Sequence, residues 1–153
     1  MSAWDDDTEQ PVYADESIAA QVGMPLVEFW HLAGRDWQRV DVPLGEVERE
    51  VEDVGWYATG DPVQAMIGLL HGSSDVLVSR PEGRWRYGLV YVPASPVVVE
   101  DLTELRTAID AVCTARRRTF RWCRYCRQPT PPEYRHEGDI CMGCAESVLG
   151  VVH

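Results

Sequence analysis

The chain has 153 residues, of which 45% are hydrophobic, and a formal net charge of −11. This length suffices for one ordinary core with a small appendage, and no apolar run of about 18 residues is present to span a bilayer. The acidic amino terminus is unlike a secretion signal, and an odd number of cysteines argues against a disulfide scaffold, so we expect a soluble cytoplasmic protein with no membrane partner.

The charge is unevenly distributed along the chain. Residues 1–110 carry 7 Arg against 21 Asp and Glu, a net charge of −14, whereas residues 111–153 carry 7 Arg against 4, a net charge of +3. All of the basic residues are Arg and none is Lys. This bias indicates a GC-rich genome, such as that of an actinobacterium or one of its phages.

The first half of the chain alternates helical and strand-like patterns. Residues 1–14 are predicted to form a disordered acidic tail, because they contain too little apolar surface to order themselves. Two short helices are expected at Glu16–Val22 and Pro25–Leu32, with Gly23 ending the first. Residues 37–42 alternate as a β-strand does.

Two further helices are predicted from apolar stripes. Within residues 44–56 the stripe consists of Val47, Val51 and Val54, with acidic residues on the other face. Within residues 61–72, Asp61 is placed as N-cap and Gly72 as the stop. The apolar face of this second helix is expected to contain Val63, Met66, Ile67 and Leu70.

The body of the protein is expected to end with a β-hairpin and a helix. Residues 74–80 and 84–93 are β-rich and are joined by Pro81-Glu82-Gly83, which predicts a turn. The last helix follows Asp101 and Glu104, which resemble a capping box, and buries Leu102, Leu105, Ile109 and Val112. We therefore predict an α+β class: a small mixed body with a β-hairpin and several helices over residues 15–118, followed by a metal-binding module over residues 119–153.

Four of the five cysteines form two Cys-x-x-Cys pairs separated by 14 residues. This spacing is typical of a zinc site with the ligands Cys123, Cys126, Cys141 and Cys144. Four thiolates fill the tetrahedral shell and leave no position for a substrate, which favours one structural Zn²⁺ per chain over a catalytic one. Cys113 is the remaining thiol.

The segment around these cysteines resembles a treble-clef zinc finger. The first pair has the place of a zinc knuckle, and the apolar spacing of Ala145, Val148, Leu149 and Val152 predicts a helix that starts where the second pair lies. The resemblance covers about residues 120–153 and is to a fold group. It implies a knuckle, a hairpin and a helix that supplies Cys141 and Cys144, and it implies no particular activity.

The arginines of this segment suggest contact with nucleic acid. Arg and aromatic rings supply phosphate contacts and base stacking. The acidic body disfavours this interpretation because it repels phosphates, and the alternative is that the arginines dock the finger onto that body. The candidate patch consists of Arg117, Arg118, Arg121, Arg124 and Arg127.

Other functions find less support in the sequence. Residues 18–32 match the apolar pattern of a helix-turn-helix, but the second helix offers Glu28 and large apolar residues where base-reading side chains belong, so a core helix is favoured. No catalytic motif is present, and we expect the protein not to be an enzyme. A second alternative is a small-ligand pocket lined by Trp56, Tyr57, Trp85, Tyr87 and Tyr91.

The hypothesis that remains is a protein that acts by binding another protein. An acidic domain is suited to a partner with a basic surface, as an inhibitor, an immunity-type or anti-defence factor, or a regulatory adaptor. The acids first considered for this contact are Glu48, Glu50 and Glu52. A nucleic-acid-binding regulator that uses the Arg-rich finger remains the alternative.

Overall fold

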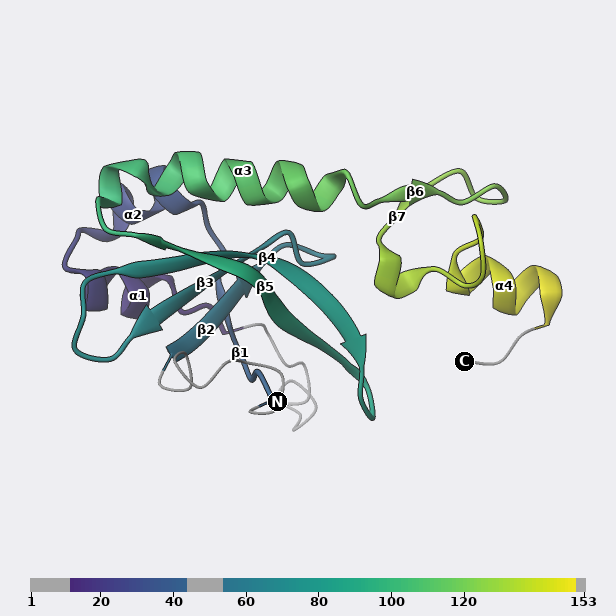
Figure 1. Ribbon diagram of the computed structural model, residues 1–153, viewed down its shortest axis with the longest axis horizontal. Coiled ribbons are helices and arrows are strands. Elements are labelled where there is room, and N and C mark those ends of the chain that lie inside the picture. Colours follow the sequence, from purple (N-terminus) through teal and green to yellow (C-terminus); the bar gives the residue numbers. More distant parts are fainter. Residues whose placement is uncertain (1–11, 44–53, 151–153) are drawn as a thin grey trace, which may run out of the picture.

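The computed structural model describes residues 12–43 and 54–150, and within them five strands form one antiparallel sheet in the order β1-β2-β3-β4-β5. Figure 1 shows α1, α2 and α3 packed on this sheet, with a separate small unit beyond the end of α3. The α+β class is confirmed. No helix in the described ranges is long and apolar enough to cross a membrane. The bounds in the sheet body are α1 Asp15–Val22, α2 Leu26–Ala33, β1 Gln38–Val40, β2 Val54–Thr59, β3 Ala65–Leu70, β4 Val76–Trp85, β5 Leu89–Val99, η4 Leu102–Glu104 and α3 Leu105–Arg117.

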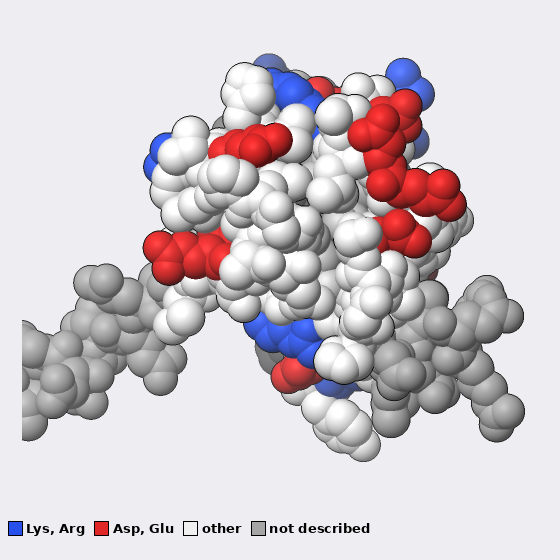
Figure 2. Space-filling model, turned by 90° about the vertical axis from the view of Figure 1, so that its left-hand side faces the viewer, with Lys and Arg blue, Asp and Glu red and all other residues white. Residues whose placement is uncertain are grey.

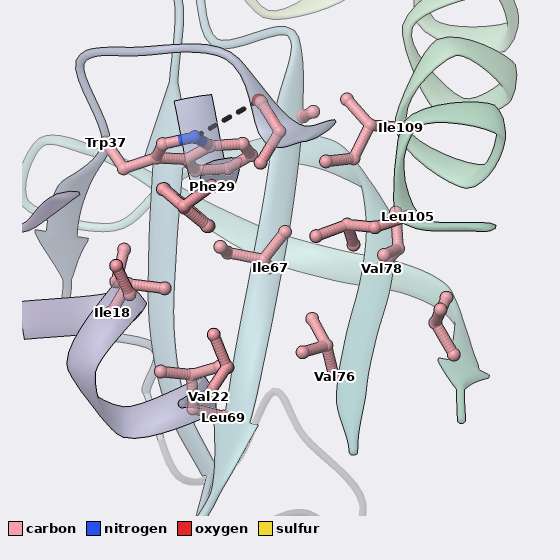
Figure 3. Close-up of a cluster of buried hydrophobic side chains, with 14 residues drawn as sticks. Ile18, Val22, Phe29, Trp37, Ile67, Leu69, Val76, Val78, Leu105 and Ile109 are labelled. Atoms are coloured by element: carbon pink, nitrogen blue, oxygen red, sulfur yellow. Dashed lines mark hydrogen bonds between the residues drawn. The ribbon is translucent and has the colours of Figure 1, made fainter. Parts of the chain in front are cut away.

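The main core lies between the sheet and the three helices. Alternate residues of the central strands, such as Ile67 and Val78, point to this side and meet Phe29 and Leu105 from the helices (Figure 3). Trp37 is fully buried in the same cluster, where its Nε1 donates to the carbonyl of Ala33 at 3.2 Å. Each large apolar side chain buried here stabilises the fold by roughly 1.5–3 kcal/mol.

The opposite side of the sheet has its own apolar cluster. It is formed by the intervening residues of the same strands, among them Trp56, Met66 and Leu77, all of which are buried. A Cβ at Gly68 would come within 2.6 Å of a Val54 methyl group and 2.9 Å of the Trp56 ring, so glycine lets that ring lie flat on β3. The central strands are thus apolar on both faces.

The first two helices and the first strand agree with their predictions. α1 ends at Gly23, whose φ of 79° is the left-handed conformation of a helix C-cap. Phe29 and Ala33 of α2 face the core, as expected for a core helix. β1 lies within the predicted strand 37–42.

The predicted helix 61–72 is wrong. Residues 60–63 form a turn, and Ala65–Leu70 is the central strand β3, paired with β2 on one side and β4 on the other. Every residue from Ala65 to Leu69 is buried because both faces of the strand are covered. In such a continuous run of apolar residues, some fall at helical spacing even though the segment is a strand.

The helix predicted within residues 44–56 is wrong where it can be compared. Val54 and Trp56 belong to strand β2. Val47 and Val51 lie outside the described residues, as do residues 1–11 of the predicted tail. Of the residues that follow this tail segment, Ala14 donates its N–H to the carbonyl of Trp37 at 2.8 Å.

The β-hairpin was predicted, but its turn lies elsewhere. β4 continues through Pro81, Glu82 and Gly83, which pair with Pro93, Val92 and Tyr91 of β5. The chain reverses at residues 86–88, where Tyr87 and Gly88 have φ values of 53° and 145°. Pro93 is tolerated because β5 pairs on one side only and forms a sheet edge among the described strands, and Pro81 lies beyond Ser79, where the pairing of β4 with β3 ends.

The last helix of the body starts as predicted. The carboxylate of Asp101 accepts from the N–H of Thr103 at 3.0 Å, which caps the short helix η4 that continues into α3. Leu105 and Ile109 are buried in the main core, and Leu102 and Val112 pack against it.

The chain after α3 forms the unit that we call the cysteine module, residues 119–150. It contains β6 (Arg121–Trp122), β7 (Pro129–Thr130), the short helix η5 (Pro132–Tyr134) and α4 (Met142–Leu149). β6 and β7 pair with each other, and an isolated bridge joins Arg135 to Cys141. The domain boundaries at residues 15, 118 and 119 stay a prediction.

Candidate metal centre

Four cysteines come together at one point of the cysteine module. Cys123 and Cys126 lie in the turn between β6 and β7, Cys141 is the N-cap of α4, and Cys144 lies in its first turn. Their Sγ atoms all lie within 4.8 Å of one another, and those of Cys126 and Cys141 are 3.8 Å apart. Tetrahedral coordination with Zn–S bonds of about 2.3 Å separates the sulfur atoms by roughly 3.8 Å. The cysteines are therefore positioned to hold one metal ion.

The local backbone favours the thiolate form of Cys123, whereas the pKa values of Cys126 and Cys144 are raised, that of Cys144 chiefly by its hydrogen bond with Cys141. The N–H of Cys141 donates to Cys123 Sγ at 3.4 Å, and the N–H of Cys144 donates to Cys141 Sγ at 3.4 Å. Burial alone would raise the pKa of Cys123, but hydrogen bonds from the N–H groups of Cys126, Cys141 and Tyr125 outweigh it and lower the pKa to about 6. The first turn of α4 adds partial positive charge.

The knuckle around the first pair is closed by backbone hydrogen bonds. The N–H of Arg127 donates to the carbonyl of Cys123 at 2.8 Å, and the N–H of Cys123 donates to the carbonyl of Gln128 at 3.0 Å. Arg127 has a φ of 57°, in the left-handed region that glycine enters without steric cost. Its backbone thus follows the path that glycine takes most easily, although its side chain is large.

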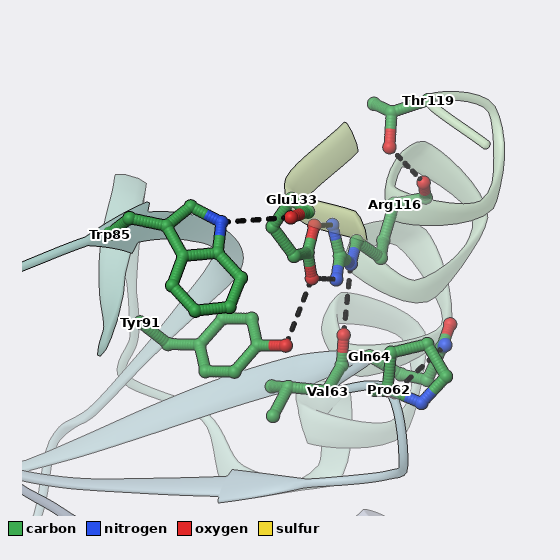
Figure 4. A network of polar contacts seen from close by, with 8 residues as sticks. All are labelled: Pro62, Val63, Gln64, Trp85, Tyr91, Arg116, Thr119 and Glu133. Atoms are coloured by element: carbon green, nitrogen blue, oxygen red, sulfur yellow. Dashed lines mark hydrogen bonds and ion pairs between the residues drawn. The ribbon is translucent and has the colours of Figure 1, made fainter. Parts of the chain in front are cut away.

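A buried ion pair attaches the cysteine module to the sheet body. Arg116, in the last turn of α3, donates from Nη1 to Glu133 Oε1 at 2.9 Å and from Nη2 to Glu133 Oε2. Its Nε donates to the carbonyl of Val63 at 2.9 Å. Figure 4 shows the two side chains lying face to face between the end of α3 and η5. The side chain of Arg116 is only 2% exposed and that of Glu133 only 1%.

Two aromatic residues of the β4–β5 hairpin complete this network (Figure 4). Tyr91 donates its hydroxyl to Glu133 Oε2 at 2.9 Å, and Trp85 Nε1 donates to the carbonyl of Glu133 at 2.9 Å. Burial would raise the pKa of Glu133, but the hydrogen bonds and charge of Arg116 outweigh it and lower the pKa. Burial and the negative charge of Glu133 raise the pKa of Tyr91, which keeps its hydroxyl protonated as a donor.

A glycine in β4 permits the close contact. A Cβ on Gly83 would lie 2.6 Å from Glu133 Cβ, closer than side-chain atoms approach. Beside it, the rings of Trp85 and Tyr134 meet edge to face with their centroids 6.4 Å apart. The hairpin and η5 are therefore fitted to each other by shape as well as by charge.

The arginines of the predicted patch are on the surface. Arg117, Arg118, Arg121, Arg124 and Arg127 are all exposed. Trp122, which lies among them in sequence, is 66% exposed. Arg124 lies 3.6 Å from Asp139 of the same module, and Arg121 donates to the carbonyls of Arg118 and Phe120.

The docking contact differs from the one expected. Among the described residues, no ion pair joins one of these five arginines to an acid of the sheet body. In the ion pair that joins the two parts, the arginine, Arg116, belongs to α3 and the acid, Glu133, belongs to the module. Arg124 is paired with Asp139 of its own module, and the other four arginines form no ion pair within the described residues.

The remaining candidate residues are not gathered into one site. Glu48, Glu50 and Glu52 lie outside the described residues. Trp56 and Tyr57 pack on opposite faces of β2, whereas Trp85 and Tyr91 lie at the contact with the module. Tyr87 projects from the hairpin tip. These five rings do not line a common ligand pocket.

Sequence reasoning missed two buried acids. No sequence pattern pointed to Glu133, because its partner Arg116 is 17 positions away and only the fold brings the two side chains together. Asp15 is the second, a buried acid at the start of α1. Its carboxylate accepts from Trp30 Nε1 at 2.9 Å and from the backbone N–H groups of Asp36 and Trp37 at 3.0 and 2.8 Å. It fastens α1 to the segment that follows α2.

Comparison of the chain with protein-family models, with curated proteins and with solved structures finds no match.

Proposed function

We propose that this chain is a zinc-stabilised interaction protein, and that it binds a basic segment of a protein partner at the groove between β5 and α3. The observation that carries the proposal is an exposed apolar sheet edge bordered by acids. Such binding would let the chain inhibit its partner, as an immunity-type or anti-defence factor, or act as a regulatory adaptor.

Zinc is the metal that best suits the cysteine cluster. Four thiolates in tetrahedral spacing match structural zinc, and the order of knuckle, short bridge and helix supports the treble-clef resemblance. The ion would close the loop that contains Glu133 and so hold the docking pair in place. Elemental analysis of the purified protein is expected to give about one zinc per chain, and iron or a metal-free protein would contradict this assignment.

The proposed docking groove lies at the other end of α3. It has a volume of about 610 Å³ and is lined by the end of β5, by residues 100–104 and by the first turns of α3. Val97 and Val98 are 58% and 50% exposed on a strand that has only β4 as a neighbour among the described strands. Backbone groups at a free strand edge pair readily with an added strand.

Charge complementarity selects the kind of partner. Glu100, Asp101 and Glu104 line the groove, and Glu100 and Glu104 form no ion pair within the described chain. Figure 2 looks at the end of the molecule that carries α1, α2 and the start of α3, and its largest group of acidic side chains lies along the upper right edge. An extended segment with Lys or Arg beside apolar residues would satisfy both features.

The test compares partners captured from the native host by the wild type and by the double variant Glu100→Arg, Glu104→Arg. We expect the variant to lose a partner that the wild type retains, and the wild-type complex to weaken as salt is raised, because acidic residues act on long-range association. Glu16→Arg with Glu28→Arg, on exposed positions of α1 and α2, is the matched control. Equal capture by the groove variant would refute the location.

Nucleic acid remains a second candidate because of one specific observation. Five arginines and Trp122 are exposed on or beside the cysteine module, and none of the five pairs with the sheet body. Filter binding with a mixed-sequence duplex and single strand at ~0.1 M salt separates the two candidates. The protein-binding proposal expects no retention. Submicromolar binding that is lost in the triple variant Arg117→Glu, Arg121→Glu, Arg124→Glu would overturn it in favour of nucleic acid.

A further inference from the structure

A second cavity lies where the cysteine module meets the sheet body, and both Arg116 and Glu133 line it. It has a volume of about 330 Å³. One wall is β4, with Arg80, Gly83 and Trp85, and the other is formed by residues 132–135 and Met142 of the module. This volume is at the small end of the range for ligand sites, which begins at roughly 300 Å³.

The cavity carries an excess of positive charge once paired groups are set aside. Of the charged residues that line it, Arg116 and Glu133 neutralise each other, and Glu82 lies 3.5 Å from Arg84. Arg80 and Arg135 also line the cavity, and neither side chain has an ion pair or hydrogen bond within the described residues. Both are half-buried, so part of their hydration is already lost. Two guanidinium groups on opposite walls are left with unused donors.

The pairing of β4 with β5 is irregular next to one of these arginines, and the extra residue lies on β5. The register with β5 shifts between Val78 and Arg80, so that Ser79 stands opposite an extra residue of β5. Ser79 is buried and donates its hydroxyl to the carbonyl of Ala94 at 2.9 Å, which fixes this bulge. Bulges occur next to functional sites because they redirect the side chains that follow them.

We propose that this cavity binds the phosphate dianion of a small phosphomonoester or phosphonate, with Arg80 and Arg135 as its ligands. Guanidinium groups bind phosphate oxygens through paired N–H donors, and two unpaired arginines match a double negative charge better than a single one. The Nε1 of Trp85 is engaged with Glu133, so its half-exposed ring is free to contact a flat group attached to the phosphate. This site is independent of the groove between β5 and α3.

Isothermal titration calorimetry with inorganic phosphate and phenylphosphonate, at about pH 8 where phosphate carries its second charge, tests the proposal. We expect saturable binding of both to the zinc-loaded wild type, with phenylphosphonate the tighter because of Trp85. The variant Arg80→Gln, Arg135→Gln should bind each at least tenfold more weakly, and Arg117→Gln, on an exposed arginine outside the cavity, should bind as the wild type does. Thermal melting and zinc content show that each variant is folded.

Three outcomes would overturn the proposal. The first is the absence of saturable binding by the wild type, and the second is equal binding by the double variant when that variant is folded. The third is equal affinity for dimethyl phosphate and inorganic phosphate. Dimethyl phosphate is a singly charged diester like the backbone of a nucleic acid, so the cavity would then not select a terminal phosphate. Equal affinity for phenylphosphonate and inorganic phosphate would show that Trp85 does not contact the ligand.

Discussion

At the scale of single residues, Arg116 and Glu133 have the largest consequence. Each is almost fully buried, and each would be an uncompensated charge without the other. Two apolar side chains of similar size would stabilise the fold about as well as a buried ion pair does. Removing only one partner strongly destabilises the fold, because the charge that remains has neither water nor a partner.

The variant Arg116→Met is therefore expected to lose about 3–5 kcal/mol of unfolding free energy, measured by urea denaturation of the metal-loaded protein. The control is Arg106→Met in the same helix, where the arginine is exposed and lies 3.9 Å from Asp110. That change should cost less than about 1 kcal/mol. Adding Glu133→Leu to Arg116→Met should restore part of the loss. A double variant less stable than Arg116→Met would contradict the account.

The protonation of Glu133 follows from the same contact. Its pKa in the folded protein is lowered, chiefly because Arg116 outweighs the effect of burial. The carboxylate therefore stabilises the fold above the unfolded pKa of about 4.3, and this contribution is lost as the pH falls through the lower folded value.

We expect the carboxyl carbon of Glu133, followed by NMR, to titrate below about 4.3 in the wild type. In Arg116→Met the titration should move above that value, because burial then acts without an opposing charge. A titration that does not move between the two proteins would show that Arg116 does not set this pKa.

At the scale of elements, the cysteine module and the sheet body are linked by a loop that contains the docking acid. Glu133 lies between Cys126 and Cys141, so a metal ion held by the cysteines also fixes the position of Glu133. Metal binding and attachment of the module are coupled for this reason.

The variant Cys141→Ser is expected to lose the metal and, with it, the order of residues 119–150, while hydrogen exchange remains slow in β2 and β3. The sheet body should also become less stable, by an amount similar to that in Arg116→Met, because Arg116 loses its partner. Cys113→Ser, on α3 outside the cluster, is the control and should keep its zinc. A sheet body of unchanged stability in Cys141→Ser would rule out the coupling.

The sequence predicted those elements whose signals are local. α1 and α3 have end signals at Gly23 and Asp101 that act within a few residues, and the four cysteines lie within 22 positions of one another. β3 was mistaken for a helix because its period is hidden when both faces are buried, here by the helices on one side and by the cluster around Trp56 on the other. The Arg116–Glu133 pair was missed for a similar reason, since two charged residues predict a buried pair only when the packing around them is known.

At the scale of the whole molecule, the described charges are separated along α3. Glu100, Asp101 and Glu104 precede its first turn, and Arg116, Arg117 and Arg118 follow one another at its end. With 13 residues, α3 separates the two groups by about 20 Å, or roughly two Debye lengths at 0.1 M salt. Arg116 is neutralised by Glu133 and Arg124 lies near Asp139, but Arg117, Arg118, Arg121 and Arg127 form no ion pair within the described residues.

Opposite charges on the two ends predict weak association between copies when salt is low. Sedimentation at about 10 mM ionic strength, where the Debye length is near 30 Å, should show larger species than at about 150 mM. The variant Arg117→Glu, Arg118→Glu should abolish the difference, and Arg39→Glu, on β1, should not. Species of the same size at both salt concentrations would contradict this prediction.

The same separation gives the described residues a permanent dipole moment along α3. In the field of a charged surface, a dipole experiences a torque, so the protein rotates before any contact forms. A basic surface would meet the groove end first, and a polyanion would meet the end with the cysteine module. The orientation of an encounter is thus selected by long-range forces, while its specificity is left to the side chains that meet afterwards.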